Sequence, residues 1–212
     1  MFDPNEEPSY AVADTETSGL FDYAKPADAD GQPRLASLGL ITLGRGLSIK
    51  SEREWLIKPD GWEMNPEASA INGLTMERLN DEGVPVREAL DEYVKLVDEG
   101  RVIVGFNTPY DLKVMRGELR RASMEDRYKE TYSVCIMRAA TGYVKIPRAN
   151  GKGYKFPKLA EAWAHFKITN HKEHSALSDA HATTLMFRFL MQLNAKLDPE
   201  KPGEVPALRV VE

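Results

Sequence analysis

The amino-acid sequence predicts a single α/β domain with a mixed central sheet, in which the first strands are antiparallel and helices lie on the flanks. Short apolar runs of strand length come first, and segments with helical spacing of apolar residues then alternate with a further strand-like run. Such alternation is typical of α/β proteins. A chain of 212 residues with 42% hydrophobic content can bury one core of this kind. We expect one domain over residues 10–197, an acidic extension over 1–9 and a proline-containing tail over 198–212.

The first part of the domain predicts an antiparallel meander. An apolar run forms the first strand, and the polar segment Phe21–Arg34 follows it as a loop. Leu35–Leu43 and Glu52–Lys58 fit two further strands. Turns at Gly44–Gly46 and near Pro59 would join these strands and allow each to return beside the previous one.

Two helices are predicted in the middle of the chain. Asn65 and Pro66 have the form of a helix N-cap and first helical residue, so a short helix should run through Ile71 and end at Gly73. The second helix is indicated by helical spacing before Gly100, which fits a C-cap. Its apolar positions are Val86, Ala89, Leu90, Tyr93, Val94 and Val97.

A buried strand at Arg101–Phe106 is expected next, followed by a helix that begins between Asn107 and Pro109. The apolar face of this helix consists of Leu112, Met115, Leu119 and Ala122. Asp111 would then lie in the first helical turn beside the strand end. From there it can face acidic residues of the first strand.

The chain predicts two more helices before its tail. Leu159–Phe166 has the apolar pattern of a helix, and Leu177–Leu197 that of a long final one. Asp179 falls in the first turn of the final helix. Three prolines beyond it predict a loose tail.

Composition excludes several classes of protein. The first nine residues carry three acids and no apolar stretch, which argues against a secretory signal, and no run approaches the roughly 18 apolar residues of a membrane span. We therefore expect a cytoplasmic protein that does not bind membranes. A single cysteine, Cys135, excludes an internal disulfide and a cysteine-rich zinc site.

The net charge of −5 is distributed unevenly along the chain. Residues 1–30 are strongly acidic, whereas residues 131–160 contain no acid. The bases of this second segment are Arg138, Lys145, Arg148, Lys152, Lys155 and Lys158, with Tyr143, Tyr154 and Phe156 among them. Cations interleaved with aromatic rings suit a single-stranded nucleic acid, although a solvated loop would have the same composition.

Four acids in recognisable settings indicate a phosphodiesterase that uses two metal ions. Asp14 and Glu16 are two positions apart in a strand, so their side chains share a face. Asp111 and Asp179 each stand in the first turn of a predicted helix. Mg²⁺ and Mn²⁺ prefer carboxylate oxygens, and two such ions about 4 Å apart support phosphodiester hydrolysis. Any one of these acids could instead be a surface charge or a partner of a helix dipole.

These residues resemble the DEDDh 3′-to-5′ exonucleases, relatives of polymerase proofreading subunits. The family's first motif matches at Asp14, Glu16, Thr17, Gly19 and Leu20, and its third at His174, Ala176, Asp179 and Ala180. The second motif keeps Asn107 and Asp111 but has Phe106 and Tyr110 where many members have His and Phe. Ile71–Thr75 also resembles a family segment, with Asn72 in place of the usual His. The resemblance spans roughly residues 10 to 195.

The resemblance implies a ribonuclease H-like fold and a specific role for each catalytic residue. Asp14 would bridge two Mg²⁺ or Mn²⁺ ions, Glu16 and Asp179 would hold the ion nearest the attacking water, and Asp111 would support the other. His174 would be the general base, a role for which an imidazole with an ordinary pKa near 6.5 is suited at neutral pH. The products would be 5′-mononucleotides released from a 3′ end.

The resemblance also implies substrate contacts. Thr17, Gly19 and Leu20 would cradle the terminal nucleotide, with the leucine against its base. Further candidate contacts are Thr15, Phe106, Asn107 and Tyr110. For some of these a structural role is equally expected, because Asn107 can cap a helix and the two aromatic residues can lie in the core.

We expect the substrate to be single-stranded DNA, with RNA as the alternative, since family members act on either. A DNA polymerase is a further candidate partner, and the oligomeric state is not fixed by the sequence. A non-catalytic nucleic-acid-binding or polymerase-associated module is the competing class of function. A complete set of mutually repelling acids argues against that class, because a site without cations gains nothing from keeping them.

Overall fold

The computed structural model describes residues 9–169, 174–193, 195, 197 and 199–201. Its core is a five-stranded sheet in the order β3-β2-β1-β4-β5. The strands are β1 (Tyr10–Thr17), β2 (Leu35–Leu43), β3 (Ile49–Leu56), β4 (Val102–Gly105) and β5 (Ser133–Cys135). β1, β2 and β3 pair antiparallel, whereas β4 is parallel to both β1 and β5. The predicted mixed sheet with antiparallel first strands is confirmed.

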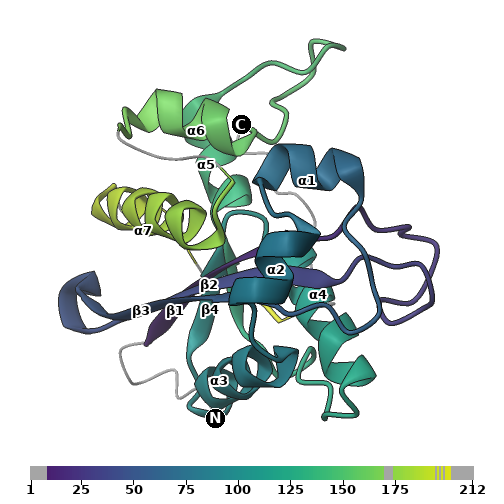
Figure 1. The fold of residues 1–212 in the computed structure, drawn as a ribbon. Helices are drawn as coiled ribbons and strands as arrows, with labels where there is room; N and C mark the ends of the chain where they lie inside the picture. The colour runs from purple at the N-terminus through teal and green to yellow at the C-terminus, as the bar shows by residue number, and fades with distance from the viewer. Residues whose placement is uncertain (1–8, 170–173, 194, 196, 198, 202–212) are drawn as a thin grey trace.

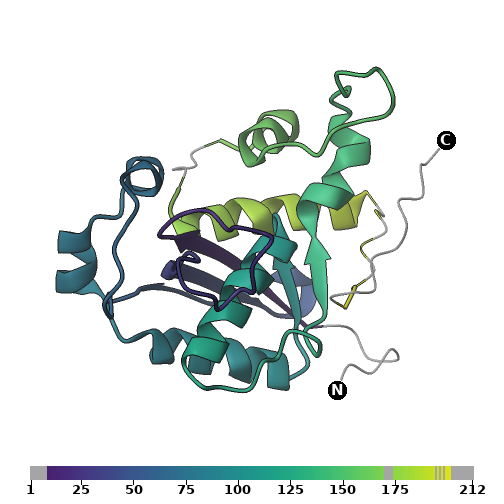
Figure 2. The same ribbon diagram turned by 90° about the vertical axis from the view of Figure 1, so that its right-hand side faces the viewer.

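Helices cover both faces of the sheet (Figures 1 and 2). α3 and α4 lie on one face, and α5, α6 and α7 lie on the other. The helices are α1 (Pro66–Asn72), α2 (Met76–Glu82), α3 (Val86–Asp98), α4 (Thr108–Arg121), α5 (Ile136–Val144), α6 (Leu159–Phe166) and α7 (Ala176–Gln192). A short 3-10 turn, η1 (Arg45–Leu47), joins β2 to β3.

The alternation of side chains along β1 divides the core into two clusters. Ala11 and Ala13 pack toward α3 and α4, whereas Tyr10 and Val12 pack toward α5, α6 and α7. Burial of these apolar surfaces is the main favourable contribution to folding. The same alternation places Asp14 and Glu16, which follow Tyr10 and Val12, on the α7 side at the carboxyl end of the strand.

Several elements differ from the sequence-based expectations. α2, β5 and α5 were not predicted, because α2 buries only one residue and β5 is three residues long. The third strand begins at Ile49 and not at Glu52, and the last helix ends at Gln192 and not at Leu197. The proposed extension and tail fall largely on residues outside those described. Among the described residues, no helix is long and apolar enough to cross a membrane.

Candidate metal centre and active site

Acidic side chains from three elements gather at the carboxyl end of β1. Asp14 and Glu16 share the face of β1 that α7 covers, and Asp179 lies in the first turn of α7. Asp111 reaches the same point from the first turn of α4. The negative charges of the other three acids all raise the pKa of Asp14, after the larger effect of burial. The four predicted acids therefore lie together.

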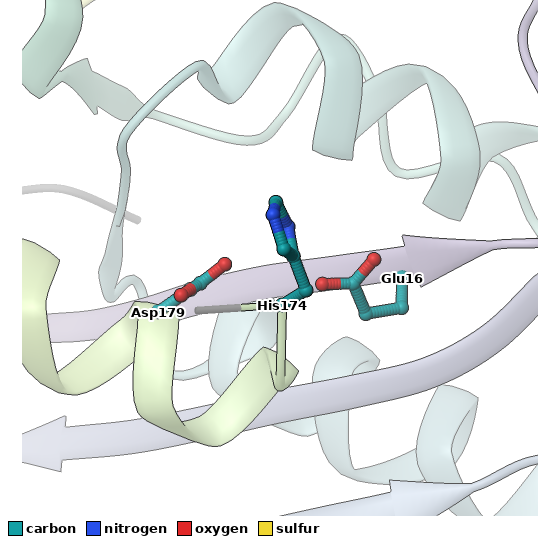
Figure 3. A group of neighbouring side chains, drawn as sticks. All are labelled: Glu16, His174 and Asp179. Carbon is teal, nitrogen blue, oxygen red and sulfur yellow. The ribbon is translucent and has the colours of Figure 1, made fainter. Parts of the chain in front are cut away.

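His174 completes the set from the segment that precedes α7. One ligand atom each from Glu16, His174 and Asp179 lies within 4.8 Å of the others. Figure 3 shows the imidazole of His174 between the two carboxyl groups. The backbone of His174 is left-handed, with φ of 63°, a conformation that is uncommon for residues other than glycine and that recurs at functional sites.

A glycine in β2 allows the start of α7 to approach the sheet beside Asp14. Gly39 pairs with Asp14 across β1 and β2. A Cβ atom on Gly39 would lie 2.5 Å from the backbone of Ala176 and Leu177. Any side chain here would therefore push the first turn of α7, which carries Asp179, away from β1.

Glu54 of β3 fixes the same end of α7 by capping it. Its Oε1 atom accepts hydrogen bonds from the hydroxyl groups of Ser37 and Ser175, at 3.1 and 3.3 Å, and from the backbone N–H of Leu177, at 3.4 Å. The helix N-terminus favours a negative charge, and Ser175 at the N-cap position makes no side-chain cap of its own. Sequence reasoning missed Glu54 because its partners are remote in the chain.

Asp111 is held by Thr15. The Thr15 hydroxyl donates to Asp111 Oδ1 at 2.7 Å, and the Thr15 backbone N–H donates to the same oxygen at 3.0 Å. Thr15 is buried, and its hydroxyl is committed to this carboxylate. This geometry supports a positioning role for Thr15, and the substrate contact stays a prediction. Strand alternation explains the geometry, because Thr15 faces α4 whereas Asp14 and Glu16 do not.

Asn72 connects the end of β1 to the segment that follows α1. Its amide donates to the Thr17 carbonyl at 3.3 Å, and its polar side chain lowers the pKa of Glu16, against the larger effect of burial. Its side-chain oxygen accepts from the Leu74 backbone N–H at 3.0 Å. Asn72, which stands where the family usually has histidine, is thus buried, and both ends of its amide group form hydrogen bonds.

The carboxyl groups of the site bind protons more tightly than isolated ones. Burial raises the pKa of Glu16 to about 7, and the charge of Asp179 adds to the effect. Burial also raises the pKa of Asp111 to about 7, although the hydrogen bonds from Thr15 oppose it. The pKa of Asp14 is raised well above its usual value. Hard cations would relieve this repulsion, so the donor set fits divalent metal ions.

A cleft of about 500 Å³ opens beside these acids. Its lining includes Glu16, Glu54, Ile71, Asn72 and His174. Leu20 lines a second cleft together with Gly19 and Asn65, and its side chain is 88% exposed.

The remaining residues that were predicted to contact substrate have different surroundings. Thr17 and Tyr110 share a hydroxyl–hydroxyl bond of 2.7 Å, and both bond the carbonyl of Gly19, so they shape the loop that carries Leu20. Phe106 is only 8% exposed and packs in the core, which is the structural alternative. Asn107 stands at the N-cap position of α4 without making a side-chain cap bond.

Together the mixed sheet and the anionic site define a nuclease on a ribonuclease H-like fold. A family model described as "Exonuclease" matches residues 11–187. The chain belongs to this exonuclease family, as a hydrolase of the DEDDh type.

Relatives and solved structures agree with this assignment. The chain is 24% identical to ribonuclease T of Histophilus somni over 88% of this chain and 84% of that protein. It is 20% identical to the 3′-5′ DNA exonuclease Cap18 of Escherichia coli, over 88% and 94%. A 24% match to DNA polymerase III PolC-type of Thermotoga petrophila covers 96% of this chain but 13% of that protein.

The fold is shared with exonuclease I of Escherichia coli. The zinc-bound complex of that enzyme with single-stranded DNA superimposes with a TM-score of 0.73, at 19% identity. The match covers 91% of this chain and 42% of the exonuclease I chain, so this chain spans less than half of that enzyme.

Replacing Gly39 with alanine should displace the start of α7 and weaken the site. The new methyl group would meet backbone atoms that cannot rotate away, and such overpacking costs about 1–3 kcal/mol. We expect a lower melting temperature and weaker Mn²⁺ binding by calorimetry. Gly142→Ala is the matched control, because its Cβ would have no atom within 4 Å. Wild-type Mn²⁺ affinity in Gly39→Ala would contradict the role of Gly39.

The metal-free protein should lose stability as the pH rises. Because folding raises the pKa of Glu16 and Asp111 to about 7, folding favours their protonated forms. The contribution of these two groups to the free energy of unfolding is fully present below the ordinary carboxyl pKa near 4. It is lost as the pH rises through about 7. In EDTA, the melting temperature should therefore fall between about pH 5 and pH 8.

Two controls accompany this pH series. Asp111→Asn should flatten the pH dependence, whereas Asp81→Asn, at an exposed position on α2, should preserve it. Mg²⁺ or Mn²⁺ should raise the melting temperature most at the alkaline end, where the carboxylates are ionised. A melting temperature that rises with pH in EDTA would contradict the claim that folding raises the pKa values of Glu16 and Asp111.

Proposed function

We propose that the protein is a 3′-to-5′ exonuclease that acts on single-stranded DNA, uses two Mg²⁺ or Mn²⁺ ions and releases 5′-mononucleotides. The observation that carries this proposal is the convergence of Asp14, Glu16, Asp111 and Asp179 with His174 beside an open cleft. The names of one relative and one solved neighbour add support, since Cap18 is a DNA exonuclease and exonuclease I was solved with single-stranded DNA.

Each residue of the site has a distinct task in the proposed reaction. Asp14, Glu16, Asp111 and Asp179 would hold the two ions, which would polarise the phosphate and stabilise negative charge as the bond to the leaving oxygen breaks. An imidazole nitrogen of His174 accepts the proton of the attacking water. The loop shaped by Thr17 and Tyr110 leaves the Leu20 side chain exposed, so that it can pack on the terminal base.

RNA is the second candidate substrate, because one relative is a ribonuclease T. Oligonucleotides of each sugar type, labelled at the 5′ or the 3′ end, distinguish the cases when they are incubated with Mg²⁺ or Mn²⁺. We expect DNA to yield labelled 5′-mononucleotide from the 3′ label at once and a shortening ladder from the 5′ label. Short internal fragments would exclude exonuclease action, and faster digestion of RNA would reverse the assignment of substrate.

A polymerase-associated role is compatible with the PolC-type match. In that setting the chain would remove mismatched 3′ nucleotides. The competing hypothesis of a non-catalytic module predicts an inactive wild-type protein whose DNA binding is unaffected by Asp14→Ala.

His174→Ala should lower kcat by about 10²- to 10⁴-fold, because it removes the proton acceptor. Mn²⁺ affinity and DNA affinity should remain close to those of the wild type. His165→Ala, an exposed histidine on α6 outside the motif, is the matched control and should remain active. Because His174 also lies within ligand distance of Glu16 and Asp179, a parallel loss of Mn²⁺ affinity would make it a metal ligand and not a base.

A further inference from the structure

A basic hairpin connects α5 to α6 and projects from the body of the molecule (Figures 1 and 2). It comprises residues 145–158, and we refer to it as the basic hairpin. Pro147 pairs with Tyr154 in an antiparallel bridge, and the Lys155 N–H donates to the Ile146 carbonyl at 2.9 Å. The Arg148 side chain closes it by donating to the Tyr154 carbonyl at 2.9 Å. The segment therefore has a defined backbone.

Two aromatic side chains are displayed on one side of the basic hairpin. Tyr154 and Phe156 are each 41% exposed, which is uncommon for large rings that have no partner to cover them. Lys155 lies between them and forms an ion pair with Glu161 at 2.6 Å. Since side chains alternate along an extended segment, the two rings lie opposite the side that faces Glu161. Exposed rings in this arrangement are suited to stacking on unpaired bases.

The positive charge of the basic hairpin is largely available to a ligand. Lys145, Lys152 and Lys158 are exposed, and the segment contains no acid. Among the described residues, Lys145 and Lys152 form no ion pair within 4.0 Å, whereas Lys155 is neutralised by Glu161. These exposed lysines can contact phosphates.

The basic hairpin is anchored at both ends to helices on the same face of the sheet as α7, the helix that carries Asp179. Residues of α5, α6 and α7 share one apolar cluster. The exposed positions of α6, Ala160, Ala164 and His165, carry no acid, and Lys167 follows at its end. The one acid of this helix, Glu161, is paired with Lys155, so a strand with its 3′ end at the acids would meet no unpaired acid along α6.

We propose that the basic hairpin binds single-stranded DNA upstream of the 3′ end, with Tyr154 and Phe156 stacking on bases and Lys145 and Lys152 contacting phosphates. This inference rests on the proposed function, because the catalytic site fixes where the 3′ end lies. The hairpin then gives the protein a preference for longer strands over short ones. Its affinity depends on salt, because each phosphate contact releases bound counterions.

The test measures binding of oligothymidylates of about 4 and about 16 nucleotides in EDTA, so that no cleavage occurs. Lys145→Gln with Lys152→Gln should flatten the slope of log Kd against log salt for the longer strand by about 1.4. Tyr154→Ala with Phe156→Ala should weaken binding of the longer strand about fivefold or more. In both variants the advantage of the longer strand over the shorter one should shrink.

The matched control is Arg45→Gln with Lys50→Gln, which removes the same charge from the β2–β3 turn and the start of β3. That turn lies beside Tyr10, at the opposite end of β1 from the acids. The control should keep the wild-type length dependence and salt slope.

If the hairpin variants also keep the wild-type length dependence and salt slope, the inference is wrong. Circular dichroism and melting temperature confirm that each variant is folded. Cleavage of the short strand by the wild-type protein with Mn²⁺ tests the proposed function separately, so the two ideas can fail independently.

Discussion

The close approach of α7 to the sheet is the constraint on which the site depends. Asp14, Gly39 and Glu54 form one row across β1, β2 and β3. The first supplies a carboxylate, the second leaves room for the helix, and the third caps the helix N-terminus. Asp179 lies in the first turn of that helix, and His174 lies just before it. This row therefore determines whether Asp179 and His174 can lie beside Glu16.

The same geometry carries an energetic cost. Four carboxylates are buried together at one end of a strand, where they lose contact with water and repel one another. Burial is the larger cause of the raised pKa values of Asp14, Glu16 and Asp111, and repulsion between the carboxylates adds to it. Hydrogen bonds from Thr15 to Asp111 offset part of this cost, and Asn72 lowers the pKa of Glu16. The apolar clusters on both faces of the sheet stabilise the rest of the fold. A site so arranged is stabilised by cations, which links metal binding to stability as well as to chemistry.

Local periodicity explains which parts of the molecule could be predicted from the sequence. The shared face of Asp14 and Glu16 follows from strand alternation, and the first-turn positions of Asp111 and Asp179 follow from helix start signals. The roles of Gly39 and Glu54 could not be predicted in this way, because they depend on which elements pack together. An interior glycine in a strand was the available signal for close backbone approach. Thr15 also holds Asp111, because its side chain lies on the opposite side of β1 from those of Asp14 and Glu16.

The most direct test of the account is a crystal structure of the protein with Mn²⁺ and thymidine monophosphate, in which anomalous scattering locates the ions. We expect two Mn²⁺ ions about 4 Å apart among Asp14, Glu16, Asp111 and Asp179, with the phosphate between them and the base beside Leu20. Mn²⁺ bound elsewhere, with the four carboxylates left unliganded, would contradict the central claim that these acids form a catalytic metal centre.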